Sequence, residues 1–420
     1  MMLLLFLADI GMRFLPVSIF AFRVWEGVWR DSGGPGPFKP GLSLVKLHSY
    51  GDLASFGNLK TPRDYRDEAF QVDKLGFRNS PRAAQPRPGG LMVGDSFAVA
   101  SSVPQDMTLP EQLTKLGDIR IYNAGARDMA TPPLVRQLAS RLNMTSGVVI
   151  YELLERRARV VPQTPVEAVE PSLSETLPPN RAQVSALSPA ETHPWLSTHP
   201  LAKTIFQKML RLLQHPSESV HRYDSRSPVK IVSRKLMKDV QNDVVLPNVY
   251  AHQVVRFTLK NNDEMLFYPI DFTKLGDVNT LDSAWVSYLS GFAEQIAEQN
   301  LRLVVLLVPN KFTVYGPLTK GPTPKVEGVL LLASLQKALA SAGICAVDLT
   351  PIYQRSAAES LSQRQYLYWR DDTHWNSRGI GVAAHALMPC VETSRQGAVS
   401  TNDILRNRLP MKGAHKGVSP

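Results

Sequence analysis

The chain has 420 residues, of which 44% are hydrophobic and 8% aromatic, so its composition excludes a disordered protein. This length suits one large domain or two ordinary ones and is ample for a buried core. The formal net charge of +10 favours attraction to acidic polysaccharides or phospholipid headgroups. Because we find no nucleic-acid-binding module, we expect no nucleic-acid partner. The cysteines, Cys345 and Cys390, are compatible with a disulfide and equally with two small buried side chains.

Residues 1–22 are mostly apolar, and about twenty apolar residues span a bilayer. Asp9 and Arg13 interrupt the run, and the arginines that follow it lie on the side that the positive-inside rule disfavours for export. A true start further upstream would explain both irregularities. No small-residue cleavage site follows, so we predict an N-terminal membrane anchor, with an amphipathic helix packed on the domain as the alternative. Residues 23–69 are predicted to be a linker.

A short apolar run between glycines, Leu91–Val93, predicts a buried strand. It leads into Gly94-Asp95-Ser96, a tight turn that would present the Ser96 hydroxyl at the end of a sheet. Ligands in open α/β sheets gather outside the carboxyl ends of the strands, so Ser96 is a candidate nucleophile. The alternative is that Asp95 and Ser96 only cap a helix.

Further strands are predicted near residues 121, 148, 303 and 345, with amphipathic helices between them. This alternation predicts a three-layer α/β domain with a mainly parallel sheet. Residues 160–280 read as an insertion that begins with a proline-rich loop. Lys311 and Tyr315, at the carboxyl end of the strand near 303, are predicted sugar or carboxylate contacts. Residues 394–420 are predicted to be a basic, disordered tail.

The second chemical motif is Arg370-Asp371-Asp372-Thr373-His374-Trp375-Asn376. A carboxylate two or three residues before a histidine can orient the imidazole. The imidazole then acts as general base toward a serine that folding brings close. His374 is therefore the candidate base for Ser96.

These motifs resemble the SGNH (GDSL-like) hydrolase superfamily. The matching residues are Gly94-Asp95-Ser96-Phe97, Asn123-Ala124-Gly125 and Asp372-Thr373-His374-Trp375. The Asp-Thr-His-Trp form resembles the branch of the alginate O-acetyltransferases and their AlgX-like relatives, as do Gly76-Phe77-Arg78-Asn79 and Glu155-Arg156. Arg78 and Asn79 are expected at the site entrance or in a surface turn. The resemblance implies an SGNH-hydrolase-like catalytic domain over residues 70–393.

The resemblance also implies roles for single residues. It makes Ser96 the nucleophile and gives the backbone N–H of Gly125 to the oxyanion hole. The spacing in the acetyltransferase-like branch selects Asp372 as the acid that orients His374, whereas the general SGNH spacing selects Asp371; we predict Asp372.

One block of the superfamily is missing. General SGNH hydrolases carry Gly-x-Asn-Asp after the third strand, and its asparagine completes the oxyanion hole. This chain has Glu155-Arg156 there instead. We expect Arg156 to substitute, because a guanidinium suits a developing oxyanion. The alternative is a solvated ion pair between Glu155 and Arg156.

The resemblance implies an extracytoplasmic O-acetyltransferase that acts on an exported polysaccharide through an acyl-serine intermediate. The alternatives are an SGNH-type acetyl esterase and a non-catalytic sugar-binding relative. We predict a periplasmic enzyme held to the cytoplasmic membrane, served by a membrane acetyl-donor protein, without metal or cofactor. Two departures limit the analogy with alginate. No carbohydrate-binding module follows, and Ser96 precedes the Asp-His pair, whereas in alginate acetyltransferases the pair comes first.

Overall fold

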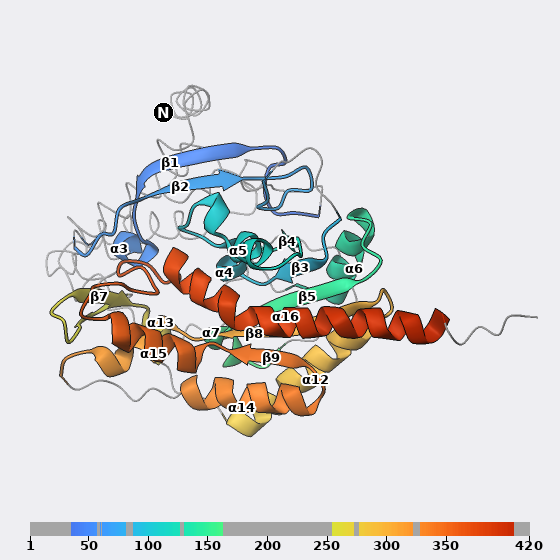
Figure 1. The fold of residues 1–420 in the computed structure, drawn as a ribbon. Coiled ribbons are helices and arrows are strands. Elements are labelled where there is room, and N and C mark those ends of the chain that lie inside the picture. The colour runs from blue at the N-terminus through green and yellow to red at the C-terminus, as the bar shows by residue number, and fades with distance from the viewer. Residues whose placement is uncertain are drawn as a thin grey trace, which may run out of the picture.

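The structure is a computed structural model that describes residues 35–56, 59, 61–80, 87–126, 130–162, 254–272, 277–321 and 328–406. Within this part of the chain, five strands form a parallel sheet of order β4-β3-β5-β8-β9 (Figure 1). The strands are β3 (Gly90–Val93), β4 (Ile121–Asn123), β5 (Gly147–Leu154), β8 (Leu301–Val308) and β9 (Cys345–Asp348). All five lie where the apolar runs predict them, and the mainly parallel α/β architecture is confirmed.

Helices cover both faces of the sheet, which is why β5 is buried along its whole length. One face packs against α5 (Leu109–Leu116), α13 (Lys311–Tyr315), α15 (Thr350–Ser360) and α16 (Ser377–Arg406). The other face packs against α6 (Pro132–Arg141), α12 (Val278–Ala297) and α14 (Gly328–Ser341). Successive side chains of a strand enter opposite cores, since Ile150 belongs to the first and Val149 to the second. The result is the three-layer arrangement seen in Figure 1.

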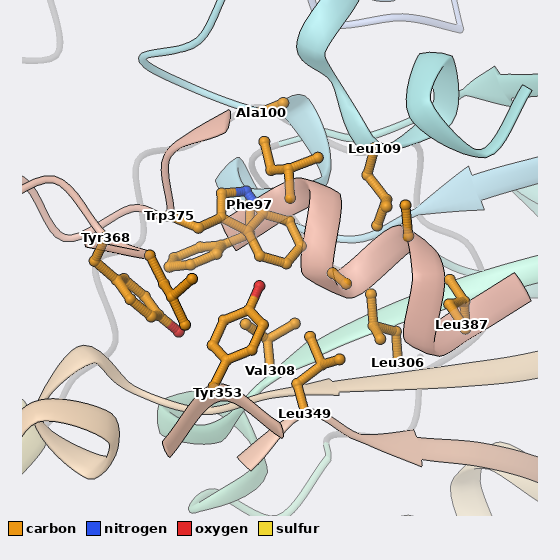
Figure 2. Packing of buried hydrophobic residues seen from close by; sticks show 14 of the residues in the cluster. Phe97, Ala100, Leu109, Leu306, Val308, Leu349, Tyr353, Tyr368, Trp375 and Leu387 are labelled. Atoms are coloured by element: carbon orange, nitrogen blue, oxygen red, sulfur yellow. The ribbon is translucent and has the colours of Figure 1, made fainter. Parts of the chain in front are cut away.

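The residues around the first motif are part of this core. Phe97 packs with Trp375 and Tyr368, at ring-centre distances of 5.4 and 6.5 Å, above Tyr353 and Leu349 (Figure 2). Aromatic pairs at such distances add roughly 1 kcal/mol each beyond the area that they bury. Phe97, the residue after Ser96, is therefore packed against Trp375, the residue after His374.

Part of the predicted linker is folded. Residues 43–49 and 66–71 form an antiparallel ribbon, β1 (Ser43–Ser49) with β2 (Arg66–Gln71), and α3 (Asp52–Phe56) lies between them. Arg66, Glu68 and Phe70 alternate on the buried face of β2. The linker prediction is wrong for these residues. Two of the inward-facing side chains of β2, Arg66 and Glu68, are charged, so the strand lacks the alternation of apolar and polar residues that predicts a strand from sequence.

The described end of the predicted insertion is a hairpin of β6 (Val255–Thr258) and β7 (Glu264–Phe267). It packs onto the loop that carries His374, where the N–H of Leu266 donates to the carbonyl oxygen of Arg370 at 2.8 Å. The rest of the predicted insertion, residues 163–253, lies outside the described residues.

The helix α16 continues to Arg406, so the predicted disordered tail is wrong for residues 394–406. No proline follows Pro389 until Pro410, so the backbone can remain helical through this stretch. Cys345 of β9 and Cys390 of α16 form a disulfide, which decides between the two readings of the cysteines. The predicted anchor, residues 1–22, lies outside the described residues. In the part of the chain that is described, no helix has the length and hydropathy needed to cross a membrane.

Candidate active site

The turn that presents Ser96, the candidate nucleophile, consists of the three residues after β3, Gly94, Asp95 and Ser96. Asp95 caps α4 (Ser96–Val99), because its carboxylate accepts the N–H of Phe97 at 2.9 Å. Gly94 has a φ of +151°, and a Cβ there would overlap the carboxyl group of Glu152 on the neighbouring strand. The cap and the glycine together put Ser96 on the first turn of the helix, at the carboxyl end of the sheet. Capping and presentation of the serine therefore coexist.

Folding brings Ser96 and His374 together across 278 residues of sequence. Ser96 Oγ lies 2.8 Å from His374 Nε2, and Asp372 Oδ1 lies 2.6 Å from His374 Nδ1. The same Asp372 oxygen accepts the backbone N–H of His374 at 3.0 Å, which fixes the ring against its own backbone. His374 and Asp372 are 3% and 2% exposed, whereas Ser96 is only half-buried. This is the arrangement that a general base and its orienting acid require.

Asp371, the alternative acid, faces away from the imidazole toward the N-terminal segment. Its carboxylate accepts the N–H groups of Gly51 at 2.7 Å and Asp64 at 3.0 Å and pairs with Arg66 at 2.9 Å. Burial raises the pKa of Asp371, and the neighbouring guanidinium of Arg66 opposes that rise. Asp371 thus fastens residues 51–66 to the catalytic loop, while Asp372 contacts the histidine ring.

Three residues that the sequence analysis missed complete the surroundings of Asp372. Its Oδ2 accepts from Arg66 Nη2 at 2.7 Å, from Ser102 Oγ at 2.9 Å and from the N–H of Asp52 at 3.2 Å. The Asp52 carboxylate accepts the N–H and hydroxyl of Thr373 at 2.8 and 2.7 Å. No sequence signal pointed to Arg66, because its partners Asp371 and Asp372 lie about 300 residues away along the chain.

Asp52, Asp372 and His374 are close enough together to suggest a cation site, since their ligand atoms lie within 4.8 Å of one another. However, the Nδ1 atom of His374 is engaged by Asp372, and the other Asp372 oxygen is paired with Arg66. The guanidinium of Arg66 already compensates the negative charge of Asp372. The donor set therefore fits a serine-activating relay and not a metal centre.

The backbone of Gly125 is arranged differently from the oxyanion-hole role that the resemblance implied. Its N–H donates to Asn123 Oδ1 at 2.8 Å. A Cβ at Gly125 would lie 2.6 Å from the nitrogen of Val99 and 2.7 Å from the carbonyl carbon of Ala98. In this structure the glycine lets the turn after β4 pack against α4, and its N–H is engaged within its own turn.

Arg156 lies beside the residue that follows the candidate nucleophile. It belongs to α7 (Glu155–Ala158), and its guanidinium carbon is 5.6 Å from the ring centre of Phe97 and 5.9 Å from that of Tyr268. The alternative to the oxyanion role, a solvated pair of Arg156 with Glu155, is not formed, because the fully buried Glu155 pairs with Arg159 at 2.6 Å. Among the described residues Arg156 has no hydrogen-bonding or ion-pair partner.

Lys311 is not a surface contact for sugars. It is 2% exposed, and its Nζ donates to four carbonyl oxygens, those of Leu266 (2.7 Å), Trp369 (2.6 Å), Arg370 (3.0 Å) and Asp372 (3.0 Å). Burial lowers its pKa to about 8, so the group is an ammonium at neutral pH. Its charge holds the catalytic loop and the β6–β7 hairpin together. A lysine that follows a strand is usually a surface residue, whereas Lys311 is buried.

Tyr315 and Arg78 are also internal supports. Tyr315 is buried, and its hydroxyl accepts the N–H of Leu367 at 2.8 Å. Arg78, predicted at the entrance or in a surface turn, is 1% exposed and donates to the carbonyl oxygens of Ala69 at 2.9 Å, Val99 at 3.1 Å and Val103 at 2.7 Å. It thereby ties the end of α4 to the N-terminal ribbon.

Two buried carboxyl groups lie under the site. Glu152 Oε2 accepts the N–H of Asp95 at 3.0 Å, and burial and the Asp95 charge raise the pKa of Glu152 well above its usual value. Burial raises the pKa of Asp271 to about 7, although Arg156 opposes that rise. The carboxyl group of Asp271 is therefore mostly neutral below about pH 7, and burial favours the neutral form of Glu152 as well.

Asp271 makes stability depend on pH in a predictable direction. Its folded-state pKa of about 7 lies above the unfolded value, so its contribution is complete below about pH 4 and is lost as pH rises through about 7. The shift of about three units corresponds to roughly 4 kcal/mol. We expect Asp271→Asn to be more stable than the wild type at pH 8 and equally stable at pH 4, as measured by urea unfolding. Asp118→Asn, at an exposed position, is the control. Equal stability of both proteins at pH 8 would contradict the assignment.

A serine at the end of a parallel strand, in hydrogen-bonding distance of a histidine that contacts an aspartate, has the geometry of the Ser-His-Asp arrangement found in serine hydrolases. Residues 261–417 match the family model of the SGNH hydrolase-like domain of the acetyltransferase AlgX. This stretch contains Asp372 and His374 and leaves out Ser96. The chain is also 29% identical over 130 residues to a protein of Azotobacter vinelandii named "Probable alginate O-acetylase AlgJ". That alignment covers 31% of the chain and 32% of the relative, so the match spans about a third of the relative's length. The resemblance to the SGNH superfamily and its AlgX-like branch is confirmed.

Proposed function

We propose that this protein is an extracytoplasmic O-acetyltransferase that transfers acetyl groups to hydroxyls of an exported acidic polysaccharide. The observation that carries the proposal is the relay from Ser96 Oγ through His374 to Asp372, with contacts of 2.8 and 2.6 Å. A binding protein has no need of a buried base beside a half-exposed serine. The relay therefore favours an enzyme over the non-catalytic alternative.

In the first half-reaction, Ser96 Oγ attacks the carbonyl carbon of the acetyl donor, and His374 Nε2 takes the hydroxyl proton. Asp372 keeps Nδ1 protonated and stabilises the imidazolium that forms. The bond between the acetyl carbon and the donor oxygen then breaks, and His374 returns the proton to that leaving oxygen. The product is an acetyl ester on Ser96.

In the second half-reaction, a sugar hydroxyl attacks the acetyl-Ser96 carbonyl, and His374 takes the hydroxyl proton. Collapse of the tetrahedral intermediate releases the acetylated sugar and returns the proton to Ser96. Two groups are suited to stabilise the oxyanion in both halves. One is the Ser96 N–H, which has no hydrogen-bond partner among the described residues, and the other is Arg156. Gly125 joins them only if its N–H leaves Asn123.

Several observations support the cellular setting that we propose. The relative named an alginate O-acetylase and the net charge of +10 both favour an acidic glycan as acceptor. The Cys345–Cys390 disulfide favours an oxidising compartment such as the periplasm. We propose that residues 1–22 hold the domain to the cytoplasmic membrane, where a membrane protein delivers acetyl groups. A reporter that is active only in the periplasm, fused at the C-terminus, is expected to be active; activity of a cytosolic reporter alone would contradict this location.

Hydrolysis by an acetyl esterase is the second candidate, because both reactions share the acetyl-Ser96 step and differ in whether water attacks next. The test supplies purified protein with a soluble acetyl ester, with and without oligomannuronate, and follows acetate and acetylated sugar by mass spectrometry. For a transferase we expect acetylated sugar to form and free acetate to fall. Unchanged acetate release with no acetylated sugar would establish an esterase.

A further inference from the structure

A pocket of about 500 Å³ lies beside the loop that carries His374. Ligand pockets for small molecules span roughly 300–1,000 Å³, so the size suits a sugar unit or two. The segments around residues 63–65, 263 and 364–376 line it. We call it the arginine–tyrosine pocket, after the three arginines and three tyrosines among its described lining residues.

Aromatic rings form one part of its lining. Tyr366 and Tyr368 are largely buried, whereas Tyr65 stands at the rim with 57% of its surface exposed. Trp369 is held from another side by the guanidinium of Arg66, 4.4 Å from its ring centre. The indole N–H of Trp369 is buried without a hydrogen-bond partner in the described part of the chain. Of these rings, Tyr65 is exposed enough to pack against the apolar face of a pyranose, and the buried rings behind it shape the pocket wall.

The charged residues of the pocket leave a positive excess. Its described lining residues include three arginines and two aspartates. Arg370 is firmly paired with Asp64, with contacts of 2.5 and 3.1 Å. Arg364 keeps 68% of its side chain exposed and reaches Asp263 only at 3.6 Å, which is too long for a hydrogen bond. The guanidinium of Arg364 is therefore available for an incoming carboxylate, which it can grip with two parallel N–H groups.

We propose that the arginine–tyrosine pocket binds a carboxylate-bearing sugar unit of the acceptor chain, with Arg364 on the carboxylate and Tyr65 on the face of the sugar ring. This assignment rests on the proposed acetyltransferase function and names where the acceptor is held. The pocket and the relay share one loop, since Trp369 and Arg370 line the pocket and the next residues, 371–374, carry the relay. The N–H of Trp369 also donates to the carbonyl oxygen of His374 at 3.3 Å. A chain held in the pocket is thus anchored to the loop that performs the chemistry.

Binding is tested with the full chain carrying Ser96→Ala, which cannot turn over, by calorimetry with oligomannuronate and with its carboxyl-reduced counterpart. We expect Arg364→Ala and Tyr65→Ala to weaken binding of oligomannuronate by about tenfold each, in line with a lost charge-assisted or stacking contact. Both side chains are exposed, so the fold should tolerate their removal. Arg141→Ala, an exposed arginine on α6, is the matched control and should leave the affinity unchanged. Equal affinity for the carboxyl-reduced sugar, or unchanged affinity in both pocket variants, would overturn the proposal.

Kinetics separate this proposal from the proposed function. We expect Arg364→Ala to raise KM for the oligosaccharide acceptor about tenfold while leaving turnover of a small aryl acetate unchanged. If the pocket variants bind oligomannuronate more weakly but the wild type only hydrolyses the ester, the binding site is supported and the transferase function is refuted. Wild-type transfer with an unchanged KM in Arg364→Ala would support the transferase and refute the pocket.

Discussion

Ser96→Ala is expected to reduce kcat for a soluble acetyl ester by at least about 10⁴-fold, with the fold retained. The reason is that the hydroxyl 2.8 Å from His374 Nε2 is the atom that would carry the acetyl group. His374→Ala should cost a similar factor, and the double variant should be no worse than either single one, because members of a relay act as a unit. Acetate release measures the rate, and intact-protein mass spectrometry should detect acetylated wild type and no acetylated Ser96→Ala.

Matched substitutions test whether the loss is specific. Ser140→Ala on α6 and His385→Ala on α16 replace exposed residues of the same types and should leave turnover unchanged. Asp372→Asn should reduce kcat by about 10⁴-fold, the loss expected when the acid that orients the histidine is neutralised. If Ser96→Ala kept wild-type turnover of the ester, the relay would have no catalytic role.

The sequence was sufficient for the sheet and the relay for physical reasons. Strands buried on both faces read as continuous apolar runs, so β5 and β8 were visible without any tertiary information. The nucleophile and the base each lie directly after a short, recognisable motif. Spacing alone allowed Asp371 or Asp372, and the resemblance to the acetyltransferase-like branch selected Asp372, whose Oδ1 lies 2.6 Å from His374 Nδ1 in the structure.

The supporting residues could not be predicted because their partners are distant in sequence. Arg66 meets Asp371 across 305 residues, and no spacing rule links them. Charged residues are rarely buried unless paired, so a strand with Arg66 and Glu68 reads as a solvated linker until the pairing is known. The contact of the Gly125 N–H could not be predicted for a different reason, because its partner is a side-chain oxygen, Asn123 Oδ1, in the same turn.

Arg66 is the positioning residue on which the second large effect is expected. Its guanidinium bridges Asp371 at 2.9 Å and Asp372 at 2.7 Å, and its side chain is 5% exposed. Burial disfavours its charge, but the two carboxylates more than offset that and raise the pKa of Arg66 above its ordinary value. Removing one member of a buried ion pair costs about 3–5 kcal/mol because the remaining charge is left uncompensated. We expect a loss of that size for Arg66→Met at pH 8, measured by urea unfolding.

The pH dependence of this loss identifies its cause. Without Arg66 the pKa of Asp371 should rise further, so the protein loses stability as pH increases and the carboxyl groups ionise. The loss should therefore be smaller at pH 4 than at pH 8. Arg141→Met, on the exposed face of α6, is the control and should show no such dependence. A loss that is the same at both pH values would point to packing against Trp369, and not to charge, as the contribution of Arg66.

The activity of Arg66 variants should report the positioning role separately from folding. Loss of the guanidinium that bonds Asp372 should leave the imidazole less well oriented, so kcat/KM should fall further in Arg66→Met than the fraction of folded protein accounts for. Arg66→Lys should recover only part of the activity, because a single ammonium cannot bond two carboxylates in parallel or stack on Trp369.

Adding Asp371→Asn to Arg66→Met removes one uncompensated charge and should restore part of the stability, an interaction that a double-mutant cycle measures. Strictly additive losses, with kcat/KM of the folded protein unchanged, would show that Arg66 serves the fold and not the relay.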